Sequence, residues 1–211
     1  MGKFSNPQDL LEHARNFIDT RMSSLKNDVN HCIKTKPYAP FPALIYCFSN
    51  IDLLGALSAG KAGKNANTTQ QSKDYMKCFM GYNELQSTLL QCIFRHNLVH
   101  LAEPLLSVIE YKSRRIAWKY NHNDVLNHLI FLPAIITTDN INVQIAPVDE
   151  IFEISILALA EDVIKSVYKD GGGYLQMLEQ DKNLQTHFKE ADENIHSIIH
   201  VKINPDGTLK C

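Results

Sequence analysis

The amino-acid sequence predicts a mainly α-helical protein. It predicts a four-helix up-and-down bundle over residues 1–104 and a mixed β/α extension over residues 105–211 that packs on the bundle. Apolar residues recur at helical spacing up to residue 104, and helix-start signals precede several of these runs. After Pro104 the pattern changes to strand-like alternation, so we expect a small β element followed by further C-terminal helices.

The first two predicted helices differ in how apolar they are. Asn6 and Pro7 form a helix start, and apolar residues then follow at helical spacing to about residue 32, which predicts an amphipathic helix. Residues 43–59 are apolar nearly all round, which predicts a central, buried helix. Asp52 is the exception in this helix, and a buried carboxylate must find a partner.

Capping patterns predict the third and fourth helices. Thr68 and Gln71 have the spacing of a capping box and open a short helix that ends near Gly81. Asn83 can cap the next helix, which we expect to run over residues 84–102 until Pro104 stops it.

The extension begins with predicted strands. Ile116, Trp118 and Tyr120 alternate with smaller or polar residues, which is typical of a strand, and residues 126–132 and 141–145 fit two further short strands. Behind them the pattern predicts a long apolar helix over residues 151–168, capped by Asp149, then a polar amphipathic stretch to about residue 200. A turn sequence in the tail predicts a small hairpin after that stretch.

Composition excludes several classes of protein. The net charge is −2, so attraction of the whole surface to nucleic acid or a membrane is not expected, and any polyanion site must be a local patch. Five cysteines without a CxxC pair argue against a disulfide framework or a zinc ribbon. The polar residues 1–9 hold no signal-peptide core, and no apolar run appears long enough for a membrane span. We therefore expect a reduced, soluble, cytoplasmic protein with no membrane partner.

The stretch of residues 94–100 is the strongest functional signal, because Arg95, His96 and His100 interrupt an apolar helix. At about 100° per residue, both histidines fall on one stripe with Cys92. Three interpretations remain open. The histidines are core residues with hydrogen-bond partners, or Cys92 and the histidines form a metal-binding face, or Arg95 and His100 handle a phosphate.

An arginine followed by four residues and a histidine, late in the last helix of a four-helix bundle, resembles the signature of the HEPN superfamily. The resemblance extends over about residues 8–104. The residues that carry it are Phe41-Pro42-Ala43, Ile51-Asp52-Leu53-Leu54-Gly55, Leu89-Leu90, Phe94-Arg95 and Leu98-Val99-His100.

By this resemblance the protein is expected to be a metal-independent endoribonuclease without a cofactor. His100 would be the general base or acid, and Arg95 would stabilise the charge that develops on phosphorus. His96, Asn97 and Asp52 would position the phosphate or substrate. The family resemblance also implies a homodimer with a composite cleft, an RNA substrate and an antitoxin-like protein partner. The alternative is a non-catalytic interaction or ligand-binding module, since some HEPN proteins have lost catalysis.

Basic and aromatic residues alternate just after the motif helix. Arg114, Arg115 and Lys119 lie close in sequence to Trp118, and such a combination can hold an RNA strand by charge and stacking. The other interpretation is a half-exposed strand with an ordinary solvated face.

Overall fold

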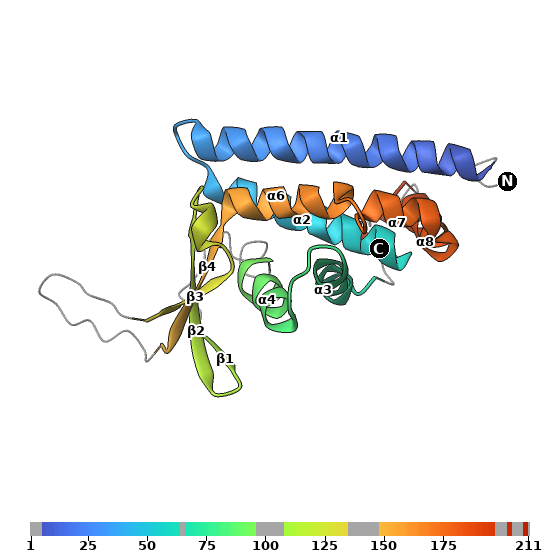
Figure 1. The fold of residues 1–211 in the computed structure, drawn as a ribbon. Helices are drawn as coiled ribbons and strands as arrows, with labels where there is room; N and C mark the ends of the chain where they lie inside the picture. Colours follow the sequence, from blue (N-terminus) through green and yellow to red (C-terminus); the bar gives the residue numbers. More distant parts are fainter. Residues whose placement is uncertain are drawn as a thin grey trace, which may run out of the picture.

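The computed structural model describes residues 6–63, 66–95, 108–134 and 148–196, together with the backbone of two short strands near the C terminus. It is mainly helical with a small four-stranded sheet, as the sequence predicts (Figure 1). Figure 1 shows helix α1 along one side of α2 and α6, with α3 and α4 on the other side and the sheet beyond one end. Strands β5 (Lys202–Ile203) and β6 (Leu209–Lys210) pair antiparallel, which confirms the predicted tail hairpin.

The first helix, α1 (Pro7–Lys34), begins where the sequence predicts. The Asn6 side chain accepts a hydrogen bond of 2.9 Å from the backbone N–H of Asp9, and Pro7 occupies the first helical position. The second helix, α2 (Pro40–Ala59), begins slightly earlier than predicted, because Pro40 rather than Pro42 opens it.

Helix α2 is the centre of the fold. It contacts α1, α3 (Thr68–Cys78), α6 (Ile156–Tyr168) and α8 (Lys182–Ile195), so nearly all its faces meet another helix. By length and composition alone, α2 could cross a membrane, contrary to the sequence-based prediction, and half of its apolar window is buried inside the protein. The core helix of a soluble protein meets the same criterion.

The predicted capping of the third helix is wrong in one detail. The cap of α3 is Asn67, whose side chain accepts from the backbone N–H of Gln70 at 3.2 Å, so the helix begins at Thr68 without a Thr68 side-chain cap. The prediction for α4 (Glu84–Leu89) is confirmed at its start. The Asn83 and Gln86 side chains each accept from the other residue's backbone, which forms a complete capping box.

The sheet contains a strand that the sequence analysis assigned to a helix. Residues 150–155 form β4 (Glu150–Ser155), and α6 begins only at Ile156, capped by the Ser155 side chain rather than by Asp149. A continuous apolar run fits a buried strand as well as a buried helix, and here pairing with two neighbouring strands decides for the strand.

The four strands have the order β1-β2-β4-β3. Strand β1 (Ile109–Tyr111) and β3 (Ile130–Pro133) pair antiparallel with their neighbours, whereas β2 (Arg114–Asn121) and β4 are parallel. The predicted strand around residues 116–120 is therefore confirmed. The predicted strand over 126–132 is shorter, since Val125–Asn127 forms a 3₁₀ turn, and residues 141–145 lie outside the described residues.

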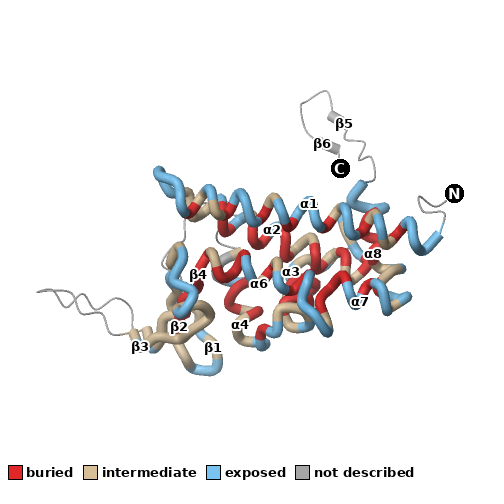
Figure 2. Tube along the Cα trace, turned by 45° about the horizontal axis from the view of Figure 1, so that its top comes forward, coloured by how far each residue is buried: buried red, intermediate tan, exposed pale blue. Residues whose placement is uncertain are grey.

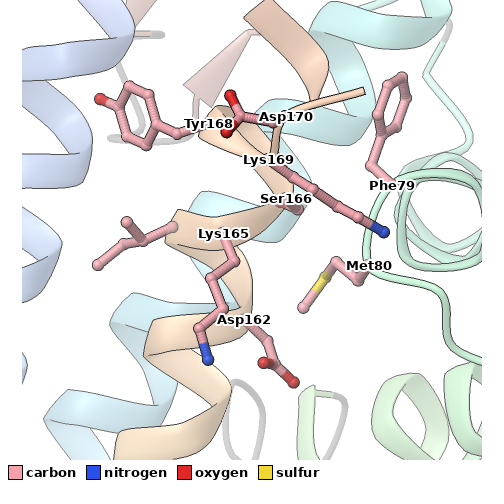
Figure 3. Close-up of a pocket in the computed structure, with 9 residues that line it drawn as sticks. Phe79, Met80, Asp162, Lys165, Ser166, Tyr168, Lys169 and Asp170 are labelled. Carbon is pink, nitrogen blue, oxygen red and sulfur yellow. The ribbon is translucent and has the colours of Figure 1, made fainter. Parts of the chain in front are cut away.

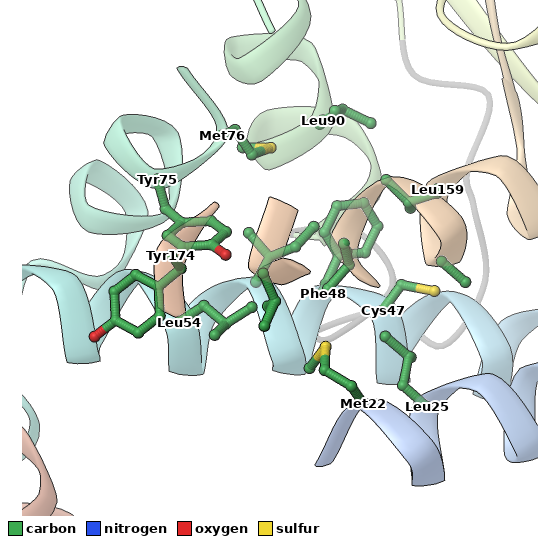
Figure 4. Packing of buried hydrophobic residues seen from close by; sticks show 14 of the residues in the cluster. Met22, Leu25, Cys47, Phe48, Leu54, Tyr75, Met76, Leu90, Leu159 and Tyr174 are labelled. Carbon is green, nitrogen blue, oxygen red and sulfur yellow. The ribbon is translucent and has the colours of Figure 1, made fainter. Parts of the chain in front are cut away.

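The core runs through both predicted segments. Phe48 and Tyr75 precede residue 104, whereas Tyr174, at the start of α7 (Tyr174–Gln180), and Phe188 follow it, and all four belong to one cluster of buried side chains. Figure 4 shows Phe48, Tyr75 and Tyr174 in this cluster, and Figure 2 shows buried residues in helices from both halves of the chain. The rings of Tyr75 and Tyr174 pack at an interplanar angle of 60°, with their centroids 6.1 Å apart. Helices from the N-terminal and C-terminal halves therefore stabilise each other.

Candidate functional site

Helix α4 does not continue as an ordinary α-helix up to the motif. After Leu89 the backbone widens into a π-helical turn, Leu90–Arg95, which places Arg95 at its end. The Leu89, Leu90 and Gln91 side chains are buried in succession, whereas Cys92 is exposed. An α-helical wheel does not describe this turn, and the two histidines of the predicted stripe lie beyond it, outside the described residues. Such turns occur often at functional sites.

Arg95 and Asp52, two of the predicted site residues, meet. The Nε of Arg95 donates to Oδ2 of Asp52 at 3.0 Å, and the two side chains are 19% and 21% exposed. The carboxylate that the sequence left without a partner in the apolar helix α2 is therefore paired with the motif arginine. In the part of the chain that the structure describes, the terminal amino groups of this guanidinium make no hydrogen bond.

Ser72, which the sequence analysis did not single out, completes this arrangement. Its hydroxyl donates to Oδ1 of Asp52 at 2.5 Å, and the residue is fully buried on α3. The Asp52 carboxylate thus has one oxygen held by a hydroxyl and the other by a guanidinium. Two donors on opposite oxygens fix the plane of the carboxylate and hence the direction from which Arg95 approaches.

Gly55 explains how Ser72 reaches Asp52. A Cβ atom at Gly55 would lie 2.9 Å from the backbone carbon and oxygen of Gln71 and 3.0 Å from the backbone nitrogen of Ser72. Side-chain atoms do not approach backbone atoms so closely, so only glycine allows α2 and α3 to cross at this distance. The Asp52-Leu53-Leu54-Gly55 sequence therefore supplies both the carboxylate and the close crossing that brings Ser72 to it.

The remaining residues of the predicted motif, His96, Asn97 and His100, lie outside the described residues. The metal-binding alternative with Cys92 therefore stays a prediction. Within residues 6–63, 66–95, 108–134 and 148–196, no three His, Cys, Asp or Glu side chains are grouped to hold a metal ion.

Gln91 is a second residue that the sequence analysis missed. It is only 2% exposed, and neither its amide nitrogen nor its amide oxygen has a hydrogen-bond partner within the described chain. A buried amide without partners is unfavourable. It lies four residues before Arg95 on the same π-helical turn, which therefore carries a buried amide as well as the motif arginine.

The three basic candidates for RNA binding on β2 all have acidic partners from β4 or the residue before it. Arg114 pairs with Glu150, and the Arg115 and Lys119 side chains lie 3.0 and 2.9 Å from acidic oxygens of Asp149 and Glu153. The hydrogen bonds from Arg115 lower the pKa of Asp149 below its ordinary value. The neighbouring Trp118 is half-buried against the core. The parallel register sets these acids beside these bases, which reduces the positive charge of the strand.

Comparisons with protein-family models, with curated proteins and with solved structures found no match. The function must therefore be argued from the residues and their geometry.

Proposed function

We propose that this protein is a metal-independent endoribonuclease of HEPN type that uses Arg95 and His100. The supporting observation is the way Arg95 is held. Asp52 takes the Nε edge of the guanidinium at 3.0 Å, which fixes its plane and leaves the edge with the two terminal amino groups for a phosphate. Partial exposure of the side chain allows that approach.

The reaction proceeds through the ribose 2′-hydroxyl. Its oxygen attacks phosphorus while His100 accepts the proton, the bond from phosphorus to the 5′-oxygen breaks, and the leaving oxygen takes up a proton. Arg95 stabilises the additional negative charge on the phosphoryl oxygens. His96 and Asn97 position the phosphate, and Asp52 acts through Arg95 as a positioning residue. The products are a 2′,3′-cyclic phosphate and a 5′-hydroxyl, formed in a cleft shared by two protomers.

The experiment incubates purified protein with mixed-sequence RNA in EDTA and analyses the product ends. Wild-type protein is expected to produce cyclic phosphate ends, and His100→Ala and Arg95→Lys are expected to lose at least about a hundredfold in rate. Arg95→Lys keeps the charge but not the planar fork. The matched control is His31→Ala, because His31 is an exposed histidine on α1 that does not belong to the motif.

Intact RNA after incubation with abundant wild-type protein would contradict the proposal, and so would equal rates for His100→Ala and His31→Ala. Light scattering then tests the shared cleft, since a monomer that cleaves RNA contradicts the composite site but not the chemistry.

The second candidate is a non-catalytic interaction module, and the Arg95–Asp52 ion pair itself favours it. An arginine that already has an acidic partner can have the purely structural role of joining α2 to the π-helical turn after α4. In that case Arg95→Ala lowers the melting temperature, wild-type protein leaves RNA intact, and affinity capture returns a specific protein.

A further inference from the structure

A separate group of titratable side chains lies away from Arg95, around Asp162 on α6. The Tyr82 hydroxyl donates to Oδ2 of Asp162 at 2.8 Å, and Nε2 of His128 lies 3.4 Å from the same oxygen. The Nδ1 of His128 accepts from the backbone N–H of Ser155 at 3.0 Å, which places the ring proton on Nε2, facing Asp162. Two neutral donors therefore serve one oxygen of this carboxylate.

The two donors favour the ionised form of Asp162. Burial acts to raise the pKa of this carboxyl, but the hydrogen bonds from His128 and Tyr82, together with the electrostatic attraction of His128 and Lys165, outweigh burial and lower the pKa below its ordinary value. Tyr82 is almost fully buried, and burial beside Asp162 raises the pKa of its phenol, so it stays a donor. Asp162 thus carries a negative charge at neutral pH that the two donors do not neutralise.

Asp162 borders a pocket of about 560 Å³ between the C-terminal half of α6 and the residues that follow α3 (Figure 3). The apolar wall consists of Phe79, Met80 and Ile164. Phe79 is fixed, because its ring stacks on Tyr75 with centroids 5.0 Å apart. A volume in this range is typical of small-molecule sites, and the other six lining residues are polar or charged.

A positive charge lies at the other end of the pocket. Figure 3 shows the Lys169 ammonium on the far side of Met80 from the Asp162 carboxylate, whereas the Asp170 carboxylate points away from Lys169. Lys169 is exposed and has no acidic partner among the described residues, while the nearby Lys165 lies 3.7 Å from Glu161. The pocket therefore has Asp162 at one end and Lys169 at the other, with Met80 between them, and the Lys165 ammonium also lies toward the Asp162 end (Figure 3).

We propose that this pocket binds a small zwitterion of the amino-acid or short-peptide type. The ammonium group lies against Asp162, the carboxylate against Lys169, and an apolar side chain against Phe79 and Met80. Opposite charges at the two ends fix the orientation of the ligand, and both of its charges are needed.

The experiment uses calorimetric titration of the full-length protein with phenylalanine and with the dipeptide leucyl-leucine. Two analogues of phenylalanine each lack one charge: phenethylamine has only the ammonium, and 3-phenylpropionate has only the carboxylate. Wild-type protein is expected to bind at least one zwitterion, and to bind each single-charge analogue at least about tenfold more weakly than that zwitterion.

Two variants test which side chain contacts each charged group of the ligand. Asp162→Asn is expected to lower the affinity for the zwitterion at least about tenfold. Lys169→Ala is expected to remove the preference for phenylalanine over phenethylamine. Lys26→Ala is the matched control, since Lys26 is an exposed lysine on α1 that does not line this pocket. Because Asp162→Asn can disturb Tyr82 and His128, circular dichroism checks its fold, and the exposed Lys169 provides an independent variant.

Failure of both zwitterions to bind wild-type protein at millimolar concentration overturns the proposal. It is also overturned if either analogue binds as tightly as the zwitterion, or if Asp162→Asn and Lys169→Ala both bind like Lys26→Ala. If the dipeptide binds and phenylalanine does not, the proposal is still supported, because the ammonium and carboxylate of the dipeptide are farther apart than those of phenylalanine.

Discussion

Two aspartates of this protein, Asp52 and Asp162, have similar surroundings, and we propose different uses for them. Each is partly exposed and accepts a hydrogen bond from a hydroxyl group of a buried residue, Ser72 in one case and Tyr82 in the other. The second group near Asp52 is the cationic Arg95, whereas near Asp162 it is a histidine ring whose proton is on Nε2. The second donor therefore differs in charge. By our proposals, Asp52 positions the guanidinium of Arg95, whereas Asp162 can bind a ligand ammonium group.

The negative charge that remains on each carboxylate explains this difference. Arg95 cancels the charge of Asp52, so that carboxylate orients the guanidinium and has little attraction left for a ligand cation. Neutral donors orient Asp162 without cancelling its charge, so it can still attract an ammonium group. Titratable residues in a pocket therefore have to be assessed with all their partners.

Removing the Asp52 carboxylate is expected to change the free energy of unfolding more than the other substitutions below. Asp52→Ala leaves a charged Arg95 and a buried Ser72 hydroxyl unpaired and is expected to lower the free energy of unfolding by about 3 kcal/mol. Asp162→Ala leaves only neutral donors unpaired, and about 1–2 kcal/mol is expected. Urea denaturation of both variants measures the two losses. Equal losses of unfolding free energy would contradict the proposed difference between the two carboxylates.

The crossing of α2 and α3 provides the next test. Gly55→Ala places a Cβ against the backbone of Gln71 and is expected to cost about 2 kcal/mol, despite the higher helix propensity of alanine. Because the crossing also carries Ser72 to Asp52, the loss in a Gly55→Ala, Ser72→Ala double variant should be smaller than the sum of the single losses. Additive losses, measured by thermal denaturation, would show that the crossing does not control this hydrogen bond.

The lowered pKa of Asp162 predicts a dependence of stability on pH. A carboxyl whose pKa is lower in the folded state stabilises the fold above its unfolded-state pKa, ordinarily 3.8, and loses this contribution as the pH falls through the folded value. The difference in unfolding free energy between wild-type protein and Asp162→Asn should therefore be constant near neutral pH and shrink below about pH 4. Denaturation at several pH values measures it, and a difference that grows on acidification would contradict the assignment.

The smallest effect is expected on the sheet. Arg115→Ala removes the ion-pair partner of Asp149, but both side chains are about 40% exposed and the backbone N–H of residue 115 still donates to Asp149 at 2.7 Å, so the expected loss is below about 1 kcal/mol. Thermal denaturation against wild-type protein measures it. A loss as large as that of Asp52→Ala would mean that the pairs on the sheet determine stability as strongly as the helical site.

The start of α1, the cap of α4 and strand β2 were predictable, because local capping and alternation specify them. The strand character of residues 150–155 was not, since hydrogen bonds to β2 and β3 rather than local pattern decide it. Of the site, Arg95 and Asp52 were found as polar exceptions in apolar helices. Ser72 has no such signal, and its role depends on the space that Gly55 leaves in another helix.

The ion pairs between β2 and β4 also determine how the chain can align with itself. A shift of β4 by one residue along β2 would separate Arg114 from Glu150 and Lys119 from Glu153 together, and would turn the buried Phe152 to the opposite face of the sheet. The ion pairs between the two strands thus act jointly against misaligned pairing of strands that are distant in sequence.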